Sequence, residues 1–266
     1  MSAIASVLRR DGRRRASAVL PPLAFGAAFL GAWELFVRLR HIKPYLLPKP
    51  SSIWAQFHDN ARLIERAASV SGANALIGLV AGTLLGSAVA LVASRWSIVQ
   101  RLITPMAVAV SVMPIVVLVS VFNNMFAITS QVPRRLMATL VVFFVVFVNV
   151  GKGLTQTDAT QRELMRSYAA SDWQVLRKVR IPNALGYFFT ALKVAAPLSV
   201  ITAFVAEYFG GPQDGLGYKI TSSIANSKDA AGWAYVGGAC LLGLVFYVAS
   251  IVLERIAMPW QARRST

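Results

Sequence analysis

Charged residues are scarce in this sequence, and acidic residues are the rarest of them. Asp, Glu, Lys and Arg make up 14% of the 266 residues, against about 25% in ordinary soluble domains. Hydrophobic residues make up 56% of the chain. A soluble protein this poor in charge would be hard to keep in solution, whereas a protein surrounded by lipid needs few surface charges. The composition therefore predicts an integral membrane protein.

The residues that catalysis and metal binding require are also missing. Cys240 is the only cysteine, so no disulfide can form within the chain. His41 and His58 stand alone, and no His, Cys and Asp cluster has the spacing of a metal site. The sequence contains neither a Gly-x4-Gly-Lys-Ser/Thr phosphate loop nor a Gly-x-Ser-x-Gly motif. We therefore expect no catalytic residue, no metal and no cofactor in this chain.

The basic residues that are present flank the apolar runs. The formal net charge is +16, which in a soluble protein would suggest a nucleic-acid partner. No DNA- or RNA-binding motif accompanies this charge. Cytoplasmic loops and anionic lipid headgroups both favour Lys and Arg next to membrane spans. We therefore expect membrane lipid, and no nucleic acid, to be the partner of these residues.

The apolar runs are long enough to cross a bilayer, since a spanning helix needs about 20 apolar residues. They are continuous and not alternating, which favours helices over a barrel. They lie at residues 16–37, 69–94, 98–122, 132–150, 186–209 and 231–258. The sequence thus predicts an all-α membrane protein with about six transmembrane helices. A single transmembrane domain is expected over residues 16–266, after a basic N-terminal segment at 1–15.

The distribution of positive charge orients the predicted spans. An even number of spans places both termini on one side. The arginines of segment 1–15 and the basic residues of loop 151–185 then share that side, so the positive-inside rule predicts that both termini are cytoplasmic. The first external loop, at 38–68, is more basic than this rule prefers. Gly78, Gly82 and Gly86 form overlapping small-xxx-small patterns, which predict close helix packing within the membrane.

The longest polar stretch between spans is loop 151–185. It has the composition of one or two short helices outside the bilayer, separated near residues 169–171. Ser171 or Asp172 is expected to cap the second helix, because either side chain can accept free amide protons. Pro182 is expected to break the helix before the next span begins. Read from the residues alone, this stretch is also compatible with a plain cytoplasmic loop.

This loop resembles the coupling loop of permease subunits of bacterial ABC importers, whose pattern is E-A-A-x3-G-x9-I-x-L-P. Ala169 stands where that family has Gly, and Leu164 and Met165 replace its paired alanines. The spacing of the pattern is intact. The equivalent positions in this chain are Glu163, Ala169, Val179, Ile181 and Pro182, and four positions of the pattern depart from the family consensus.

Further segments resemble the nitrate/sulfonate/taurine-type subfamily of these permeases, in the same order along the chain. Together they cover most of residues 40–260. They are Leu47-Pro48-Lys49-Pro50 after the first span, Phe143-Phe144 through Asn149 in the fourth, Val205-Ala206-Glu207 in the fifth, and the turn Gly215-Leu216-Gly217.

The resemblance implies a type I ABC importer permease fold with a short cytoplasmic coupling helix, located in the bacterial inner membrane as a multi-pass protein. It implies that two copies of the permease form the translocation pathway. It also implies two ATP-binding subunits, which carry the ATP and Mg, and an extracytoplasmic solute-binding protein. The residues expected at the ATPase contact are Glu163, Ala169, Ala170, Ser171, Asp172, Trp173, Arg177 and Pro182.

Candidate pathway residues lie mainly in the third predicted span. Pro114 would loosen that helix, which is tolerated where protein or water covers the freed carbonyls. We expect Met113, Ser120 and Asn123 to line the route, although a simple packing kink would leave the same pattern.

Three ionisable residues fall within other predicted spans, where charge is costly and often functional. Glu34 is expected to pair with Arg38, four residues later. Lys193 either snorkels to the cytoplasmic interface or faces the pathway and attracts an anion. Glu207 is expected to serve as a gate or in helix packing, or to lie simply at the interface.

The substrate implied by the resemblance is a small solute such as nitrate, a sulfonate, taurine, a pyrimidine vitamin precursor, riboflavin or an aromatic acid. The loop at 209–229 is expected on the outer face, where a solute-binding protein would dock, or as a surface loop without a special role. The alternative functions are a self-powered secondary transporter and an intramembrane enzyme. The first would usually show more spans, inverted repeats or charged mid-membrane sites, and the second would need catalytic residues on facing helices.

Overall fold

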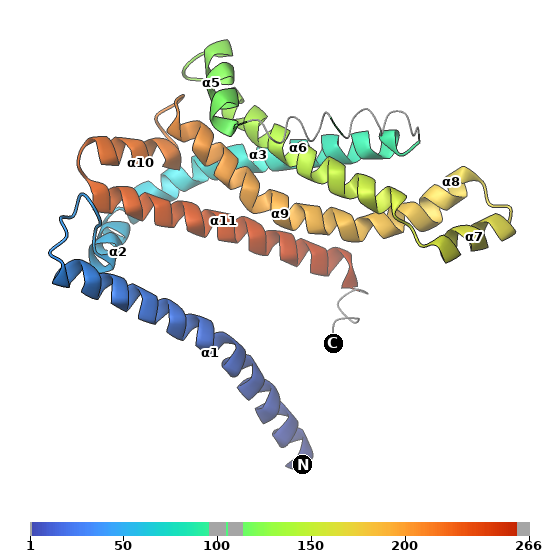
Figure 1. The fold of residues 1–266 in the computed structure, drawn as a ribbon, viewed down its shortest axis with the longest axis horizontal. Helices are drawn as coiled ribbons and strands as arrows, with labels where there is room; N and C mark the ends of the chain where they lie inside the picture. Colours follow the sequence, from blue (N-terminus) through green and yellow to red (C-terminus); the bar gives the residue numbers. More distant parts are fainter. Residues whose placement is uncertain (1, 96–104, 106–113, 260–266) are drawn as a thin grey trace.

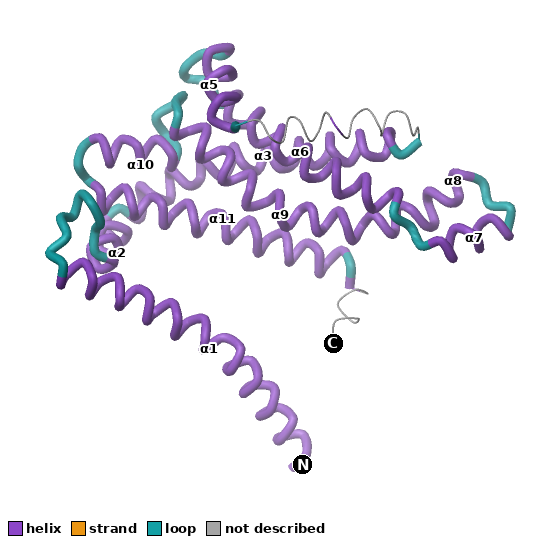
Figure 2. The backbone as a smooth tube through the Cα atoms, viewed as in Figure 1, coloured by secondary structure: helices purple, strands orange, loops and turns teal. Residues whose placement is uncertain are grey.

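The chain is described by a computed structural model that covers residues 2–95, 105 and 114–259, with side chains from residue 20 onward. All regular elements of these residues are helices (Figure 2). The all-α prediction is therefore confirmed. In chain order the elements are α1 (Ser2–Leu39), α2 (Pro50–Asp59), α3 (Ala61–Ala93), α5 (Ile115–Met125), α6 (Val132–Thr155), α7 (Ala159–Ser167), α8 (Asp172–Val175), the π-helix η1 (Leu176–Arg180), α9 (Ile181–Tyr208), α10 (Leu216–Ala225) and α11 (Asp229–Ala257).

Five helices of the described chain are long and apolar enough to cross a membrane. They lie at Leu20–Leu39, Ala61–Ala93, Val132–Thr155, Asp172–Tyr208 and Asp229–Ala257. Most of the predicted third span, 98–122, lies outside the described residues, and its last part forms the shorter α5. Several helices extend beyond the predicted spans because helical hydrogen bonding continues into polar residues outside the lipid. For example, α3 begins at Ala61, before the predicted start at residue 69.

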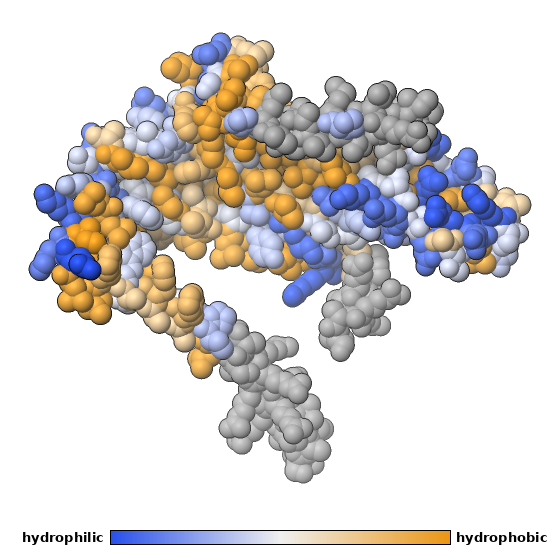
Figure 3. Space-filling model, in the orientation of Figure 1, coloured by the Kyte–Doolittle hydropathy of each residue, from blue (hydrophilic) through white to orange (hydrophobic). Residues whose placement is uncertain are grey.

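The helices α3, α6, α9 and α11 run side by side along the long axis of the molecule (Figure 1). The short helices α7 and α8 project from one end of this bundle, and α10 lies at the other end. The first helix, α1, diverges from the bundle. Hydrophobic residues cover much of the bundle, and hydrophilic residues gather on the α7–α8 end (Figure 3). This distribution suits a protein whose sides contact lipid.

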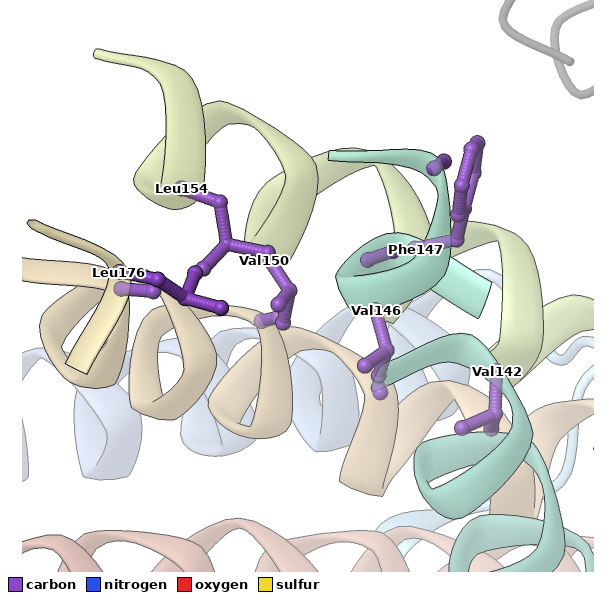
Figure 4. Close-up of a cluster of buried hydrophobic side chains, with 11 residues drawn as sticks. Val142, Val146, Phe147, Val150, Leu154 and Leu176 are labelled. Carbon is purple, nitrogen blue, oxygen red and sulfur yellow. The ribbon is translucent and has the colours of Figure 1, made fainter. Parts of the chain in front are cut away.

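The core of the bundle lies where α6 packs between α3 and α9. Val142, Val146, Val150 and Leu154 of α6 are almost completely buried in it, together with Leu176 of η1 (Figure 4). On the α3 side the contact depends on small residues. A Cβ atom added at Gly78, Gly82 or Gly86 would collide with Ala138, Thr139 or Phe143 of α6, respectively. The predicted role of these glycines in close helix packing is therefore confirmed.

The expectation that Pro182 breaks the helix is wrong. The chain is helical without interruption from Asp172 through α8, η1 and α9 to Tyr208, and Pro182 is the second residue of α9. Proline lacks an N–H group, and its ring crowds the carbonyl four residues earlier in an α-helix. Here a π-turn precedes it, in which the N–H of Ile181 donates to the carbonyl of Leu176, five residues earlier. This wider turn accommodates the proline within a continuous helix.

Candidate functional site

The projecting segment consists of two short helices with well-formed N-caps. Asp158 caps α7 by accepting a hydrogen bond from the N–H of Thr160, at 2.9 Å. Ser171 caps α8 in a reciprocal arrangement with Gln174. The N–H of Ser171 donates to Gln174 Oε1 at 2.8 Å, and the N–H of Gln174 donates to Ser171 Oγ at 3.4 Å. The predicted division of the loop into two helices is confirmed, with Ser171 and not Asp172 as the cap.

The turn between α7 and α8 places Ala169 in a left-handed backbone conformation, with a φ of 48°. Its N–H donates to the carbonyl of Arg166 at 2.9 Å, and the N–H of Ala170 donates to the carbonyl of Met165 at 3.0 Å. These two bonds form a Schellman motif, in which glycine usually occupies the left-handed position. The side chain of Ala169 is exposed. The conformation of the turn, and not a close approach within the chain, therefore explains why glycine suits this position.

The predicted contact residues lie on one projecting segment and most of them are exposed. Large apolar side chains stand beside them: Tyr168 is 75% exposed, Trp173 56% and Leu164 54%. Exposed apolar side chains that lie together, rather than singly, mark protein or membrane contact surfaces. Of the residues predicted from the sequence to contact the ATPase, Ala170 is half-buried. The others are exposed: Glu163, Ala169, Ser171, Asp172, Trp173, Arg177 and Pro182.

Two contacts that the sequence did not predict join this segment to the bundle. The guanidinium group of Arg95, just after α3, lies 5.4 Å from the centre of the Trp173 ring. Asn183 at the start of α9 donates from Nδ2 to the carbonyls of Gly153 at 2.7 Å and Gln156 at 3.0 Å. The base of the projecting segment is thereby held against the ends of α3 and α6.

A buried polar cluster lies at the opposite end of α9, around Glu207. This side chain is 1% exposed. Its Oε2 accepts hydrogen bonds from Ser71 Oγ of α3 at 2.7 Å and from the N–H of Gly217 at 3.1 Å. Arg134 of α6, near the start of the predicted span 132–150, is also 1% exposed, and its Nη1 lies 3.9 Å from Glu207 Oε1. Of the readings open for Glu207, the geometry favours helix packing.

The same arginine fixes the loop between α9 and α10. Arg134 Nη1 donates to Asp214 Oδ1 at 3.0 Å and to Gln131 Oε1 at 2.8 Å, and its Nη2 donates to the carbonyl of Pro212. Gln131 Nε2 in turn donates to Asp214 Oδ2 at 2.7 Å. Asn74 of α3 completes the network by donating to Gln131 Oε1 at 2.8 Å. The polar groups of three spanning helices therefore converge on one loop.

The two glycines of the Gly-Leu-Gly turn are required by this packing. A Cβ atom at Gly215 would overlap the carboxylate of Glu207, and one at Gly217 would overlap the carbonyl of Phe204. Between them, the N–H of Leu216 donates to Ser71 Oγ at 2.9 Å. The turn that the sequence singled out is thus the element that closes the cluster over Glu207.

The two other ionisable residues that the sequence singled out within spans, Lys193 and Glu34, are also paired. Lys193 Nζ lies 2.9 Å from both carboxylate oxygens of Glu254, so it joins α9 to α11. Neither predicted role of Lys193, snorkelling or attracting a pathway anion, included this partner. Glu34 accepts from Arg38 Nε at 2.8 Å, which confirms the predicted pair. It also accepts from the N–H of Ser51 at 3.1 Å, which ties α1 to the start of α2.

Among the described residues of this single chain, those predicted to line the pathway are not gathered in one cluster. Met113 lies outside the described residues, and Pro114 directly precedes α5. On α5, Ser120 is exposed and donates to the carbonyl of Val116 at 3.1 Å. The buried Nδ2 of Asn123 has no acceptor among the described residues. Lys193 and Glu207 are engaged in the separate contacts given above. Within the same residues, no three His, Cys, Asp or Glu side chains are grouped as metal ligands.

Comparison with known proteins agrees with this architecture. Residues 78–265 match the profile of the family described as binding-protein-dependent transport system inner membrane component. The chain is 30% identical over 254 residues to a formylaminopyrimidine transport permease protein of Halalkalibacterium halodurans, covering 94% of this chain and 100% of the relative.

More distant relatives carry other transport names. A bicarbonate transport system permease protein of Synechocystis is 26% identical over 276 residues, covering 94% of this chain and 89% of the relative. A putative aliphatic sulfonates transport permease protein of Bacillus subtilis is 22% identical over 259 residues, covering 96% and 92%. Family profile, full-length relatives and apolar helices agree: the chain belongs to the binding-protein-dependent transport system inner membrane component family, as a multi-pass permease of a type I ABC importer.

Proposed function

We propose that two copies of this chain form the translocation pathway of an importer, and that α7 and α8 receive the motion of two partner ATPase subunits. The observation that carries the proposal is the continuity of the helix from Asp172 to Tyr208. Its first turns lie in the projecting segment, and the remainder crosses the bundle (Figure 1). A displacement applied at α8 would therefore be transmitted along α9.

The surface of the projecting segment supports its role as a docking element. Tyr168 and Trp173 offer exposed aromatic rings, which are enriched in protein interfaces. Glu163 and Arg177 place charges of both signs beside them. The caps at Asp158 and Ser171 stabilise the short helices, so the segment can transmit force without unfolding. ATP and Mg would be held by the ATPase subunits.

The same segment sets the proposed orientation. Arg162, Arg166, Arg177, Lys178 and Arg180 surround it, and positive charge favours the cytoplasmic side. With α7 and α8 in the cytoplasm, the loop at 209–229 and α10 lie on the outer face. A solute-binding protein would dock there, and both termini of the chain would be cytoplasmic.

The proposed substrate is a small polar solute delivered by that binding protein. The names of the relatives include a formylaminopyrimidine, bicarbonate and aliphatic sulfonates, so the class varies within the family. In this chain Lys193 of α9 is paired with Glu254 of α11, and the buried Arg134 of α6 is paired with Glu207 of α9 and with Asp214 of the following loop. The pathway therefore offers few free groups, and selection would lie mainly with the binding protein.

Co-purification with the ATPase subunit tests the proposal. We expect Trp173→Ala combined with Tyr168→Ala to abolish co-purification and ATP-driven uptake, because both exposed rings are lost from the docking segment. The matched control is Phe25→Ala, which removes a ring that is 75% exposed on α1. That control should leave association intact. ATPase binding by the double variant at the wild-type level would refute the assignment of the segment.

A further inference from the structure

An apolar groove of about 640 Å³ runs between α1, α2 and α11, away from both sites described above. Its volume lies within the roughly 300–1,000 Å³ typical of ligand sites. Residues from Val236 to Leu244 of α11 line it, a rise of about 12 Å along the helix. The groove is therefore elongated along the direction in which the spanning helices run. Its lining includes Trp33, Ile53, Trp54, Trp233, Gly237 and Cys240.

The groove exists because α1 meets the rest of the chain only near its end. Trp33 of α1 contacts Trp233 of α11, with ring centres 5.8 Å apart. Beyond that contact α1 diverges from α11 (Figure 1). Both helices belong to the membrane-spanning set, so the groove opens toward acyl chains.

Positive charge gathers where the groove meets the α1–α2 loop. Arg38 lies one turn beyond Glu34 and pairs with it, and Lys49 directly precedes Pro50, which lines the groove. Arg40 and Lys43 are exposed in the loop between them. Glu34 is the only acidic residue from 34 to 58, so this end of the groove keeps a net positive charge. The same charge makes the loop more basic than its proposed external side requires.

The spacing of these groups matches the depth of a phospholipid. Arg38 lies five residues beyond Trp33, or about 7.5 Å along the helix. The interfacial layer between headgroups and hydrocarbon is about 5–8 Å thick on each side of a bilayer. Trp33 is thus placed at the level of the ester groups when Arg38, and with it the start of the basic α1–α2 loop, is placed at the phosphates. Its indole Nε1 is buried and has no acceptor in the described part of the chain.

We infer that this groove binds an anionic phospholipid. One acyl chain lies along α11 between Trp33 and Leu244, and the phosphate lies by Arg40, Lys43 and Lys49. After a small rotation of the indole ring, an ester carbonyl of the lipid accepts the hydrogen bond of Trp33. The lipid joins α1 to α11 and thereby holds α1 against the bundle. This inference requires the membrane location of the chain and is independent of the proposed coupling to an ATPase.

Native mass spectrometry of the full-length chain tests the inference. The protein is exchanged into micelles that contain either phosphatidylglycerol or phosphatidylcholine with identical acyl chains, and the lipid retained on it is measured. We expect retention of phosphatidylglycerol to exceed that of phosphatidylcholine by about tenfold, because basic residues near the surface favour anionic headgroups. Equal retention of the two lipids would overturn the inference.

Two pairs of variants locate the site. Arg40→Gln with Lys49→Gln should remove the preference for phosphatidylglycerol, whereas Arg62→Gln with Arg66→Gln, at the start of α3, should retain it. Gly237→Leu should abolish lipid retention. Its first carbon fits 3.7 Å from the Phe57 ring, and the remainder of the side chain fills the groove. Gly243→Leu, which adds the same side chain to α11 in open space, should bind lipid normally.

Folding of each variant is checked by its thermal unfolding in phosphatidylcholine micelles, which should match the wild type. Lipid retention by a folded Gly237→Leu variant at the wild-type level would refute the site. Another outcome would also overturn it: a wild-type dimer free of lipid that Gly237→Leu converts to monomer would assign the groove to the second copy of the chain.

Discussion

Glu207 of α9 and Arg134 of α6 bury their charged groups beside one another, with 3.9 Å between Glu207 Oε1 and Arg134 Nη1. Neither side chain is accessible to solvent, and both are stabilised by hydrogen bonds from other elements. Removing either member of such a pair leaves an isolated buried charge, which is strongly destabilising. Most polar atoms of the cluster are hydrogen-bonded, whereas Glu207 Oε1 and Arg134 Nε have no hydrogen-bond partner among the described residues. This cluster therefore holds the α9–α10 loop in a single arrangement.

Loss of the Glu207 carboxylate should destabilise the folded protein. We expect Glu207→Ala to lower the free energy of unfolding by about 3–5 kcal/mol, since Arg134 loses a buried counter-charge, and Ser71 and the N–H of Gly217 lose their acceptor. Thermal unfolding in detergent measures this effect. The control is Glu65→Ala, which removes an exposed carboxylate of α3 and should change stability by less than about 0.5 kcal/mol. Similar stability of the two variants would contradict the structural role of the cluster.

Addition of a single methyl group to the Gly-Leu-Gly turn should also lower the free energy of unfolding. Gly215→Ala places a Cβ atom against the Glu207 carboxylate, and overpacking of this kind costs about 1–3 kcal/mol. Gly243→Ala is the matched control, because its Cβ atom enters open space on α11. That change should be neutral or stabilise the helix by up to about 1 kcal/mol. Unfolding midpoints of the two variants in the same detergent distinguish these outcomes.

The turn at Ala169 should respond to backbone conformation and to side-chain bulk in different ways. We expect Ala169→Gly to stabilise the α7–α8 turn by about 1 kcal/mol, because glycine adopts a positive φ without strain. Limited proteolysis at this turn measures the gain as slower cleavage. Faster cleavage of the glycine variant would contradict the left-handed assignment.

A bulky residue at the same position tests coupling. Ala169→Leu should leave the spanning helices folded, because the side chain is exposed, but it should uncouple ATP hydrolysis from uptake. The measurement is the ratio of solute transported to ATP hydrolysed by the reconstituted importer, with Ala169→Gly as the control that retains coupling. An unchanged ratio in the leucine variant would refute the role proposed for this turn.

The pair between Lys193 and Glu254 should behave as one unit. Lys193→Met and Glu254→Gln should each destabilise the chain, and the double variant should lose less than the sum of the two. A coupling energy of about 0.5–3 kcal/mol is expected for residues in direct contact. A double-mutant cycle of thermal unfolding measures it. Additive effects would show that the two side chains do not interact in the membrane.

Much of the fold could be predicted because hydropathy is a property of short stretches of chain. The apolar runs located the long helices, and loop 151–185 could be divided near residues 169–171 into two helical parts from its polar composition. The helix boundaries were less accurate. The apolar run shows where lipid lies, whereas hydrogen bonding decides where the helix ends, as at Ala61. Pro182 was misread because its local tendency to break a helix is offset by the π-turn before it.

By itself, then, the sequence determined that this protein is a helical membrane permease with a polar segment between two of its spans. The partners of its buried charges were decided only by tertiary structure. Glu207 meets Ser71 and Arg134, and Lys193 meets Glu254, across 61 or more residues of chain. The physical reason is that a charge in the membrane is stabilised by whichever group the packed helices bring beside it. The separation of two residues along the chain does not indicate whether the packed helices will bring them together.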